Sequence, residues 1–162
     1  MYPVVGTTEE IVNYKDYDFI VAIGNNQIRK KIANNLFEQS FKVVNLIHPT
    51  AVIDETVIMG LGSVVMANAV INAYAKLGKG CIVNTSATVD HDDVIEDYVH
   101  ICPGAHIAGT TTIGHETWVG IGSSVINNVT IASKCMIGAG SVIVKNLSES
   151  GTYVGVPARR IK

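Results

Sequence analysis

The segment 81–107, CIVNTS-ATVDHD-DVIEDY-VHICPG-AHI, places an aliphatic residue at every sixth position. The same column runs through residues 47–143 without a miss: Ile47, Ile53, Met59, Val65, Ile71, Leu77, Val83, Val89, Ile95, Ile101, Ile107, Ile113, Val119, Val125, Ile131, Ile137 and Ile143. Two positions before each member from Ile53 onward lies a second column of small residues or valine, with Asp93 as its exception. Side chains two apart on a strand share a face, so both columns are expected to point inward.

A short fixed period sustained over this length indicates a solenoid. Each hexad supplies one short strand and a corner, three hexads close a triangular coil of 18 residues, and coils stack about 4.8 Å apart. The sequence therefore predicts a mainly β chain, with a parallel β-helix of hexapeptide repeats over 47–145 and a capping segment over 146–162. Its left hand is an expectation from resemblance to hexapeptide-repeat proteins, because the usual crossover rule favours the right hand.

The first 46 residues have a different pattern. Residues 17–24 predict a buried strand that ends in a glycine turn, and residues 41–47 predict a second strand. Between them, Ile28, Ile32 and Leu36 suggest the buried face of a helix from Gln27 to about Gln39. One βαβ unit cannot bury both faces of its sheet. We therefore expect residues 1–46 to form a small, incomplete, Rossmann-like α/β module that contributes to nucleotide-sugar binding.

Composition excludes several classes of function. The chain has 162 residues and a formal net charge of −2, which gives no electrostatic footprint for nucleic acid. No apolar run approaches the roughly 18 residues of a membrane span, and no basic-then-apolar leader opens the sequence, so a cytoplasmic location is expected. Cys81 and Cys135 fall about 14 Å apart at the strand spacing, too far for a disulfide. No metal-ligand spacing is present, and we expect no metal.

Residues 18 apart should stack, which gives each face of the prism one outward stripe. One stripe is apolar and carries the chain's single tryptophan: Val64, Ile82, His100, Trp118 and Met136. An exposed apolar stripe of this size is typical of a contact surface. For a triangular prism, a cyclic homotrimer is the simplest closed assembly.

The corners carry the residues suited to chemistry. His91 lies between Asp90 and Asp92, where a carboxylate raises its basicity and fixes its tautomer, and Gly109 one coil above leaves room beside the ring. Asn84 belongs to another corner, about 16 Å away along a prism edge. A site that uses both side chains is therefore expected to lie between two subunits.

Five strings, taken together, carry a family resemblance over essentially the whole chain. They are Ala22-Ile23-Gly24-Asn25-Asn26 with Ile28-Arg29-Lys30-Lys31-Ile32, Val44-Asn45-Leu46-Ile47-His48, Val83-Asn84-Thr85-Ser86, Asp90-His91-Asp92 and Val154-Gly155-Val156-Pro157-Ala158-Arg159. The chain resembles the bacterial hexapeptide-repeat acyltransferases that modify nucleotide sugars. That family includes UDP-4-amino-sugar N-acetyltransferases of the N-acetylbacillosamine pathway and sialic acid O-acetyltransferases.

The resemblance implies an acetyl-CoA-dependent N-acetyltransferase acting on a UDP-linked amino sugar, by direct transfer without an acyl-enzyme. It implies that His91 is the general base and Asp92 its acidic partner. It places Asn84 with the glycine turn Gly24-Asn25-Asn26 on the acceptor side. Acetyl-CoA, the co-substrate, is implied to contact His100, Gly109, Ile121 and Ala139.

The resemblance fails at the N-terminus, where family members usually begin with a strand, a loop containing glycine and histidine, and a helix that hold the nucleotide. We expect either a truncated sequence or a different acceptor. The alternatives are an O-acetyltransferase for sialic acid or a related sugar, a non-catalytic trimeric β-helix scaffold, and a metal protein of the carbonic anhydrase type.

Overall fold

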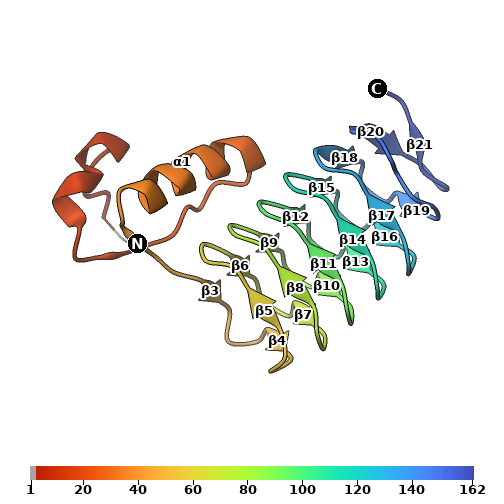
Figure 1. The fold of residues 1–162 in the computed structure, drawn as a ribbon, viewed down its shortest axis with the longest axis horizontal. Helices are drawn as coiled ribbons and strands as arrows, with labels where there is room; N and C mark the ends of the chain where they lie inside the picture. Colours follow the sequence, from red (N-terminus) through yellow and green to blue (C-terminus); the bar gives the residue numbers. More distant parts are fainter. Residues whose placement is uncertain (1–2) are drawn as a thin grey trace.

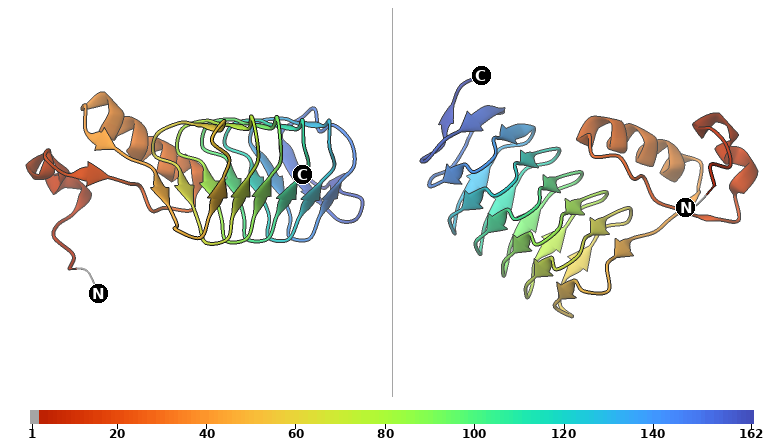
Figure 2. Two further views of the ribbon diagram at one scale, coloured as in Figure 1. Left: turned by 90° about the horizontal axis from the view of Figure 1, so that it is seen from below. Right: turned by 180° about the vertical axis from the view of Figure 1, so that it is seen from behind.

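The computed structural model describes residues 3–162 as a three-sided parallel β-helix with a small α/β module beside its first coils (Figure 1). Strands 18 residues apart pair in parallel register, as Thr88 does with Val70 below and His106 above. Figure 2 shows the coils stacked along one axis. The period of six in the sequence is thus confirmed as a solenoid.

The three sheets are the faces of the prism. One face contains β3 (Leu46–Ile47), β6 (Val64–Val65), β9 (Ile82–Val83), β12 (His100–Ile101), β15 (Trp118–Val119), β18 (Cys135–Ile137), β20 (Gly151–Val154) and the antiparallel β21 (Arg159–Arg160). The next contains β4 (Val52–Ile53), β7 (Val70–Ile71), β10 (Thr88–Val89), β13 (His106–Ile107), β16 (Ser124–Val125) and β19 (Val142–Ile143). The third contains β5 (Ile58–Met59), β8 (Lys76–Leu77), β11 (Val94–Ile95), β14 (Thr112–Ile113) and β17 (Thr130–Ile131).

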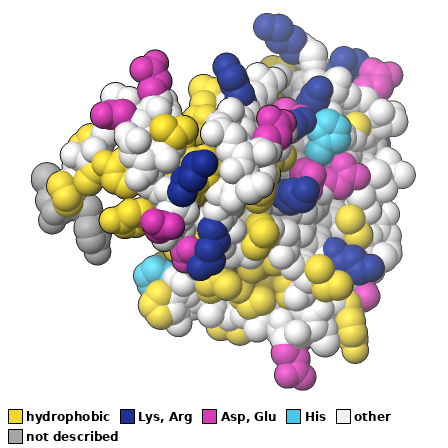
Figure 3. Space-filling view, turned by 60° about the vertical axis from the view of Figure 1, so that its left-hand side comes forward, with side chains coloured by type: hydrophobic (Ala, Val, Ile, Leu, Met, Phe, Trp, Pro, Cys, Tyr) yellow, Lys and Arg dark blue, Asp and Glu magenta, His cyan; other side chains and the backbone are white. Residues whose placement is uncertain are grey.

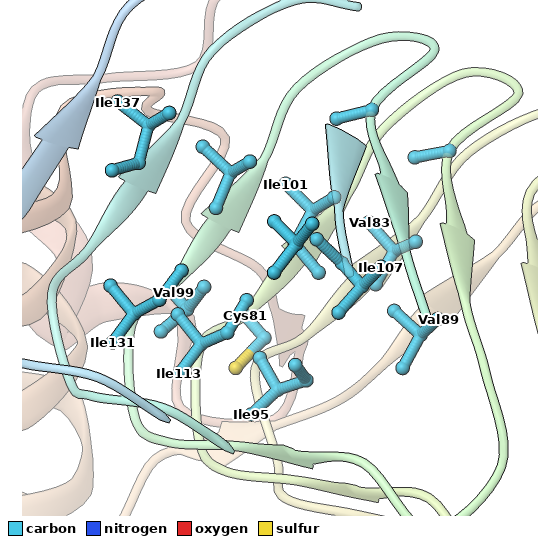
Figure 4. Close-up of a cluster of buried hydrophobic side chains, with 14 of the residues drawn as sticks. Cys81, Val83, Val89, Ile95, Val99, Ile101, Ile107, Ile113, Ile131 and Ile137 are labelled. Atoms are coloured by element: carbon cyan, nitrogen blue, oxygen red, sulfur yellow. The ribbon is translucent and has the colours of Figure 1, made fainter. Parts of the chain in front are cut away.

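Both predicted columns fill the prism (Figure 4). From β6 to β19 the aliphatic residues of the first column are buried, and small members of the second, such as Ala69, Ala87 and Ala105, have no exposed surface. Burial of each large aliphatic side chain contributes about 1.5–3 kcal/mol, so the stacked coils stabilise one another. Asp93 is equally buried in the second column, as a carboxylate among apolar side chains.

The N-terminal module contains the 3₁₀ helix η1 (Thr8–Tyr14), β1 (Asp18–Phe19), α1 (Asn26–Glu38) and β2 (Lys42–Val43). β1 and β2 pair in parallel and α1 connects them, which confirms a βαβ unit. The predicted strand lengths are wrong. β1 has only β2 to pair with, so residues 20–23 leave the sheet and lie against the β-helix. The strand expected over 41–47 is divided, because Leu46 and Ile47 already pair with β6 in the first coil.

The helix is confirmed, with Asn25 as its N-cap, and its predicted buried face is right at Leu36 and Ile32 but wrong at Ile28. Ile28 is 49% exposed, whereas Arg29, Ala33 and Leu36 are buried. These three residues follow the i, i+4, i+7 spacing of a helix face that is turned toward the β-helix. The reason is a polar contact: Arg29, not an aliphatic residue, joins α1 to the prism.

Arg29 is 1% exposed and donates five hydrogen bonds. Nε reaches the carbonyl of Gly80 at 2.7 Å, and Nη2 reaches the carbonyl of Tyr98 at 2.9 Å, so one corner of the β-helix is held in two successive coils. The remaining bonds go to the carbonyls of Ile23 and Gly24 and to Oδ1 of Asn26 within the module. Burial lowers the pKa of Arg29, but neutral oxygens satisfy its donors.

This arrangement also corrects the exposed apolar stripe. Ile82 and His100 are 8% and 6% exposed, because residues 20–24 of the same chain lie over them. Met136, at the upper end of the stripe, remains 45% exposed. The stripe is therefore in part a surface for the chain's own N-terminal module, and the homotrimer stays a prediction.

The five hydrogen bonds of Arg29 form a joint between the module and the β-helix. Replacement of Arg29 by leucine should destabilise the fold by about 3–4 kcal/mol, because the five oxygen acceptors in this joint lose their donor. Arg29→Lys is the matched control: it keeps a cation and up to three donors, so its loss should be smaller. Urea unfolding followed by circular dichroism measures both. A leucine variant within about 1 kcal/mol of wild type would contradict the role of this joint.

Candidate functional site: two corners of the prism

The first group of candidate residues surrounds His91 at the corner after β10. Its Nδ1 lies 2.9 Å from Oδ2 of Asp92, and its side chain is 58% exposed. Asp92 has φ +58°, a left-handed conformation that aspartate tolerates and that turns its carboxylate back toward the ring. A carboxylate accepts only, so Nδ1 carries the proton and Nε2 keeps its lone pair. The arrangement suits a general base.

Acidic groups around His91 favour its protonated form. The hydrogen bond to Asp92 is the main reason that its pKa is raised, and the charges of Asp90, Asp92 and Asp93 act in the same direction. Asp90 also accepts the backbone N–H of His91 at 2.8 Å and an amide hydrogen of Asn72 at 2.8 Å. The corner is thus anchored to the coil below as well as to its own turn.

Gly109 lies directly beside this imidazole, as the stacking predicted. A Cβ at this position would be 2.7 Å from Nε2 of His91, closer than contact allows. The next residue, Thr110, donates its backbone N–H to the carbonyl of His91 at 2.9 Å. The glycine therefore leaves the reactive nitrogen of His91 accessible.

The second group lies along the eight-stranded face and includes Asn84, His100 and Gly24. These three line a pocket of about 550 Å³ between residues 20–24 and the β-helix, whose other walls are mostly aliphatic. Figure 3 shows hydrophobic side chains between the module and the β-helix, with charged groups of both signs around them. Few polar groups in an apolar pocket are typical of a small-molecule site.

The tautomer of His100 follows from its neighbours. Oδ1 of Asn84 accepts the backbone N–H of Thr85 at 2.8 Å, so Nδ2 of Asn84 is the donor toward Nε2 of His100 at 3.1 Å. The proton of the neutral ring is then on Nδ1, which is buried and makes no hydrogen bond within residues 3–162. The ring packs 4.3 Å from that of Trp118. His100 therefore has a buried donor without a partner among the described residues, at the edge of the apolar pocket.

Burial lowers the pKa of His100 to about 4, and the charge of Arg29 adds to the shift. The carbonyl of Gly24 opposes it without closing a hydrogen bond to Nδ1. At neutral pH this imidazole is therefore uncharged, and its pKa is shifted in the opposite direction to that of His91.

Asn25 and Asn26, the remaining predicted acceptor residues, have structural contacts. Asn25 caps α1 by accepting the backbone N–H of Ile28 at 3.0 Å. Asn26 is 8% exposed, with its amide nitrogen on the carbonyls of Glu116 and Thr117 and its oxygen on Arg29. Asn26 thus belongs to the contact between module and prism, and its role with the acceptor stays a prediction.

Ile121 and Ala139 follow β15 and β18, on the same face and corner as Asn84 after β9. The backbone N–H of Gly140 donates to the carbonyl of Ile121 at 2.8 Å, and Ile121 is 57% exposed. The structure therefore divides the predicted residues into two groups. Asn84, His100, Gly24, Ile121 and Ala139 lie along one face and its corner, whereas His91, Asp92 and Gly109 lie at the next corner.

Sequence reasoning missed Arg29 as a buried contact and residues 20–23 as a pocket wall, whereas the contact of His100 with Trp118 follows the predicted stripe. Arg29 could have been found from its spacing, because it lies on the same helix face as Ala33 and Leu36. The apolar pattern of Ile28, Ile32 and Leu36 drew attention to a neighbouring face instead. No group of three or more potential metal ligands occurs among residues 3–162. Within the same range, no helix combines the length and apolar character needed to cross a bilayer.

Comparison with known proteins identifies the family. Residues 1–36 match the model of the PglD N-terminal domain. The acetyltransferase domain of PglB from Neisseria gonorrhoeae FA1090 is 44% identical, with a TM-score of 0.97 over 99% of this chain and 80% of that one. This chain belongs to the hexapeptide-repeat sugar acyltransferases.

Other relatives of this acyltransferase chain were solved with ligands. The same PglB domain has a structure in complex with acetyl coenzyme A. PerB from Caulobacter crescentus, in complex with CoA and GDP-perosamine, is 37% identical, with a TM-score of 0.96 over 99% of this chain and 79% of that one. The solved neighbours are left-handed β-helices, which confirms the expected hand.

Curated sequences give a shorter match. GDP-perosamine N-acetyltransferase from Escherichia coli O157:H7 is 28% identical over 107 residues, which is 66% of this chain and 48% of that protein. The match thus spans about half the length of the curated relative.

We expect His100 to make stability depend on pH. Its folded pKa of about 4 lies below the ordinary histidine pKa of 6.5, so the unfolded chain binds the proton first as pH falls. This residue's contribution is present above pH 6.5 and is lost toward pH 4, by about 3 kcal/mol. Urea titrations at several pH values should show a smaller loss in His100→Phe, whereas His106→Phe, at an exposed histidine, should retain it. Identical pH dependence in wild type and His100→Phe would contradict a neutral buried ring.

Proposed function

We propose that this acyltransferase moves an acetyl group from acetyl-CoA to the amino group of a nucleotide-linked amino sugar. The observation that carries the proposal is the geometry of His91: Nδ1 lies 2.9 Å from Asp92, and Nε2 faces the space that the missing side chain of Gly109 leaves open. Support for the donor comes from relatives solved with acetyl coenzyme A or CoA. Support for the acceptor comes from PerB with GDP-perosamine and from the match to the PglD N-terminal domain.

In this mechanism Nε2 of His91 removes a proton as the amine attacks the thioester carbonyl. The new C–N bond forms, the C–S bond breaks, CoA leaves as the thiolate, and the proton is transferred from the imidazolium to the thiolate or to solvent. Asp92 stabilises the imidazolium through Nδ1. Direct transfer is favoured because Cys81, Cys102 and Cys135 are buried, and burial raises the pKa of each thiol.

We further propose that the protein forms a homotrimer and that the active site lies between two subunits. Within one chain, His91 lies at the corner after β10, and Asn84 lies at the corner after β9, beside His100. A second copy could bring its His91 corner to the first chain's Asn84 corner. The site would then combine the base His91 with the pocket at Asn84 and with Ile121 and Ala139, the predicted acetyl-CoA contacts. The UDP-linked amino sugar expected from the sequence is one acceptor of the proposed class.

The direct test is CoA-thiol release and product mass with UDP- and GDP-linked 4-amino sugars, compared between wild type and His91→Ala. Loss of the base should reduce kcat by about 10²–10⁴-fold. His106→Ala removes a histidine one coil above that faces solvent and should keep wild-type kcat. Wild-type protein that turns over none of these acceptors, or a fully active His91→Ala variant, would overturn the proposal.

The acid limb of this activity should lie above pH 6.5. The pKa of His91 is raised, so protonation removes the base as pH falls through that elevated value. Asp92→Asn removes the main cause of the shift and should move the acid limb to lower pH while reducing kcat. A log kcat–pH profile of both proteins measures this, and an unmoved limb would contradict the assignment of Asp92.

Gly109→Ala should reduce kcat by at least about tenfold, because the new methyl would lie within 2.7 Å of Nε2 and displace the imidazole. The double variant with His91→Ala tests the cause: the second substitution should cost nothing further once the ring is absent. An additive loss in the double variant would show that Gly109 acts elsewhere.

A further inference from the structure

Asp93 is the one buried carboxyl in the inward column of the prism and has no exposed surface. Its two oxygens bond in different directions. Oδ2 accepts the backbone N–H of Asp90 at 3.0 Å, across the turn that carries His91. Oδ1 accepts the backbone N–H of Thr111 at 2.8 Å, in the coil above, two residues after Gly109. One carboxylate thus joins the turn of the base to the glycine corner beside the ring.

Ser63, in the same inward column, makes a similar pair of contacts through its hydroxyl, but at one of them it donates a hydrogen bond where Asp93 accepts one. Oγ of Ser63 accepts the N–H of Cys81, 18 residues on, at 3.1 Å, and donates to the carbonyl of Gly60, three residues back, at 3.0 Å. Asp93 keeps the first contact but accepts at residue i−3 instead of donating. It therefore acts on the backbone N–H of its turn, which a serine hydroxyl in this arrangement leaves alone.

The backbone ladder shows the effect at Asp90. Its N–H is shared between Asp93 and the ladder carbonyl of Ile107, which lies 3.2 Å away. The stacked equivalents, from Asn72 to Val89 and from Ala108 to Val125, measure 2.9 and 3.0 Å. The contact with Asp93 thus accompanies the longest of these three ladder bonds, immediately before His91.

We propose that Asp93 is a positioning residue for His91, and this rests on the proposed function above. Its carboxylate fixes the backbone of the 90–93 turn against the Gly109–Thr111 corner, and the turn in turn directs the imidazole. Asp93 itself touches no ring atom of His91 in the hydrogen bonds of the structure; Asp92 makes that contact.

The cost of burying this group supports a role beyond packing. Burial raises the pKa of Asp93 to about 7, with the charge of Asp90 acting in the same direction. The N–H groups of Thr111 and Asp90 and the charge of His91 favour the ionised form. Both oxygens accept hydrogen bonds, and the ionised carboxylate is the stronger acceptor for the two N–H groups.

The test compares Asp93→Ser with Ser63→Ala. In Asp93→Ser the hydroxyl can still accept from Thr111, as Ser63 does from Cys81, and the Asp90 N–H can return fully to Ile107, so the fold should survive. We expect kcat to fall at least tenfold, with KM for acetyl-CoA within twofold, because three of the four predicted acetyl-CoA contacts (His100, Ile121 and Ala139) lie on another face and corner. Ser63→Ala removes buried hydrogen bonds of matching geometry and should lower Tm without lowering kcat.

A second readout does not depend on turnover. In ¹H–¹³C spectra of histidine side chains, the titration midpoint of His91 should move to lower pH in Asp93→Ser and stay in place in Ser63→Ala, because the charge of Asp93 favours the imidazolium. Wild-type kcat with an unmoved midpoint in Asp93→Ser, or equal loss of kcat in both variants, would overturn the inference. Inactive wild-type protein would refute the proposed function instead. A shifted midpoint in Asp93→Ser would still show that Asp93 influences the titration of His91.

Discussion

The candidate site residues of the β-helix are placed by hydrogen bonds between strands 18 residues apart. The ladder brings Gly109 beside His91 and His100 one coil above Ile82, and it aligns Ile121 with Ala139. Because the strands are only two or three residues long over most of the prism, no single strand is stable alone. Their stability comes from stacking, so the site is as rigid as the column of aliphatic residues behind it.

The second constraint is the joint formed by Arg29. Its five hydrogen bonds fix the Ile23–Gly24 turn over the eight-stranded face, and this creates the apolar pocket that contains Asn84 and His100. The same cation adds to the depression of the pKa of His100. One side chain thus sets both the wall of the pocket and the charge state of its histidine.

Two imidazoles of one chain consequently have opposite character. His91 is exposed among carboxylates, and its pKa is raised; His100 is buried between aliphatic and aromatic side chains, and its pKa is lowered to about 4. A base must accept a proton near neutral pH, whereas a neutral donor beside an apolar pocket must not. The separation follows from desolvation at one residue and from paired charge at the other.

The sequence by itself determined the solenoid, because an unbroken period of six permits only one way to bury its columns. It also determined the stacking of Gly109 on His91, since stacking is arithmetic in steps of 18. Contacts between the module and the prism were decided only by tertiary structure. Arg29 has no repeat to reveal its partners, and the exposed stripe predicted from Ile82 and His100 is covered by residues distant in sequence. Periodicity encodes contacts between equivalent positions, whereas a contact between two different architectures depends on shape and unpaired polar groups that no period records.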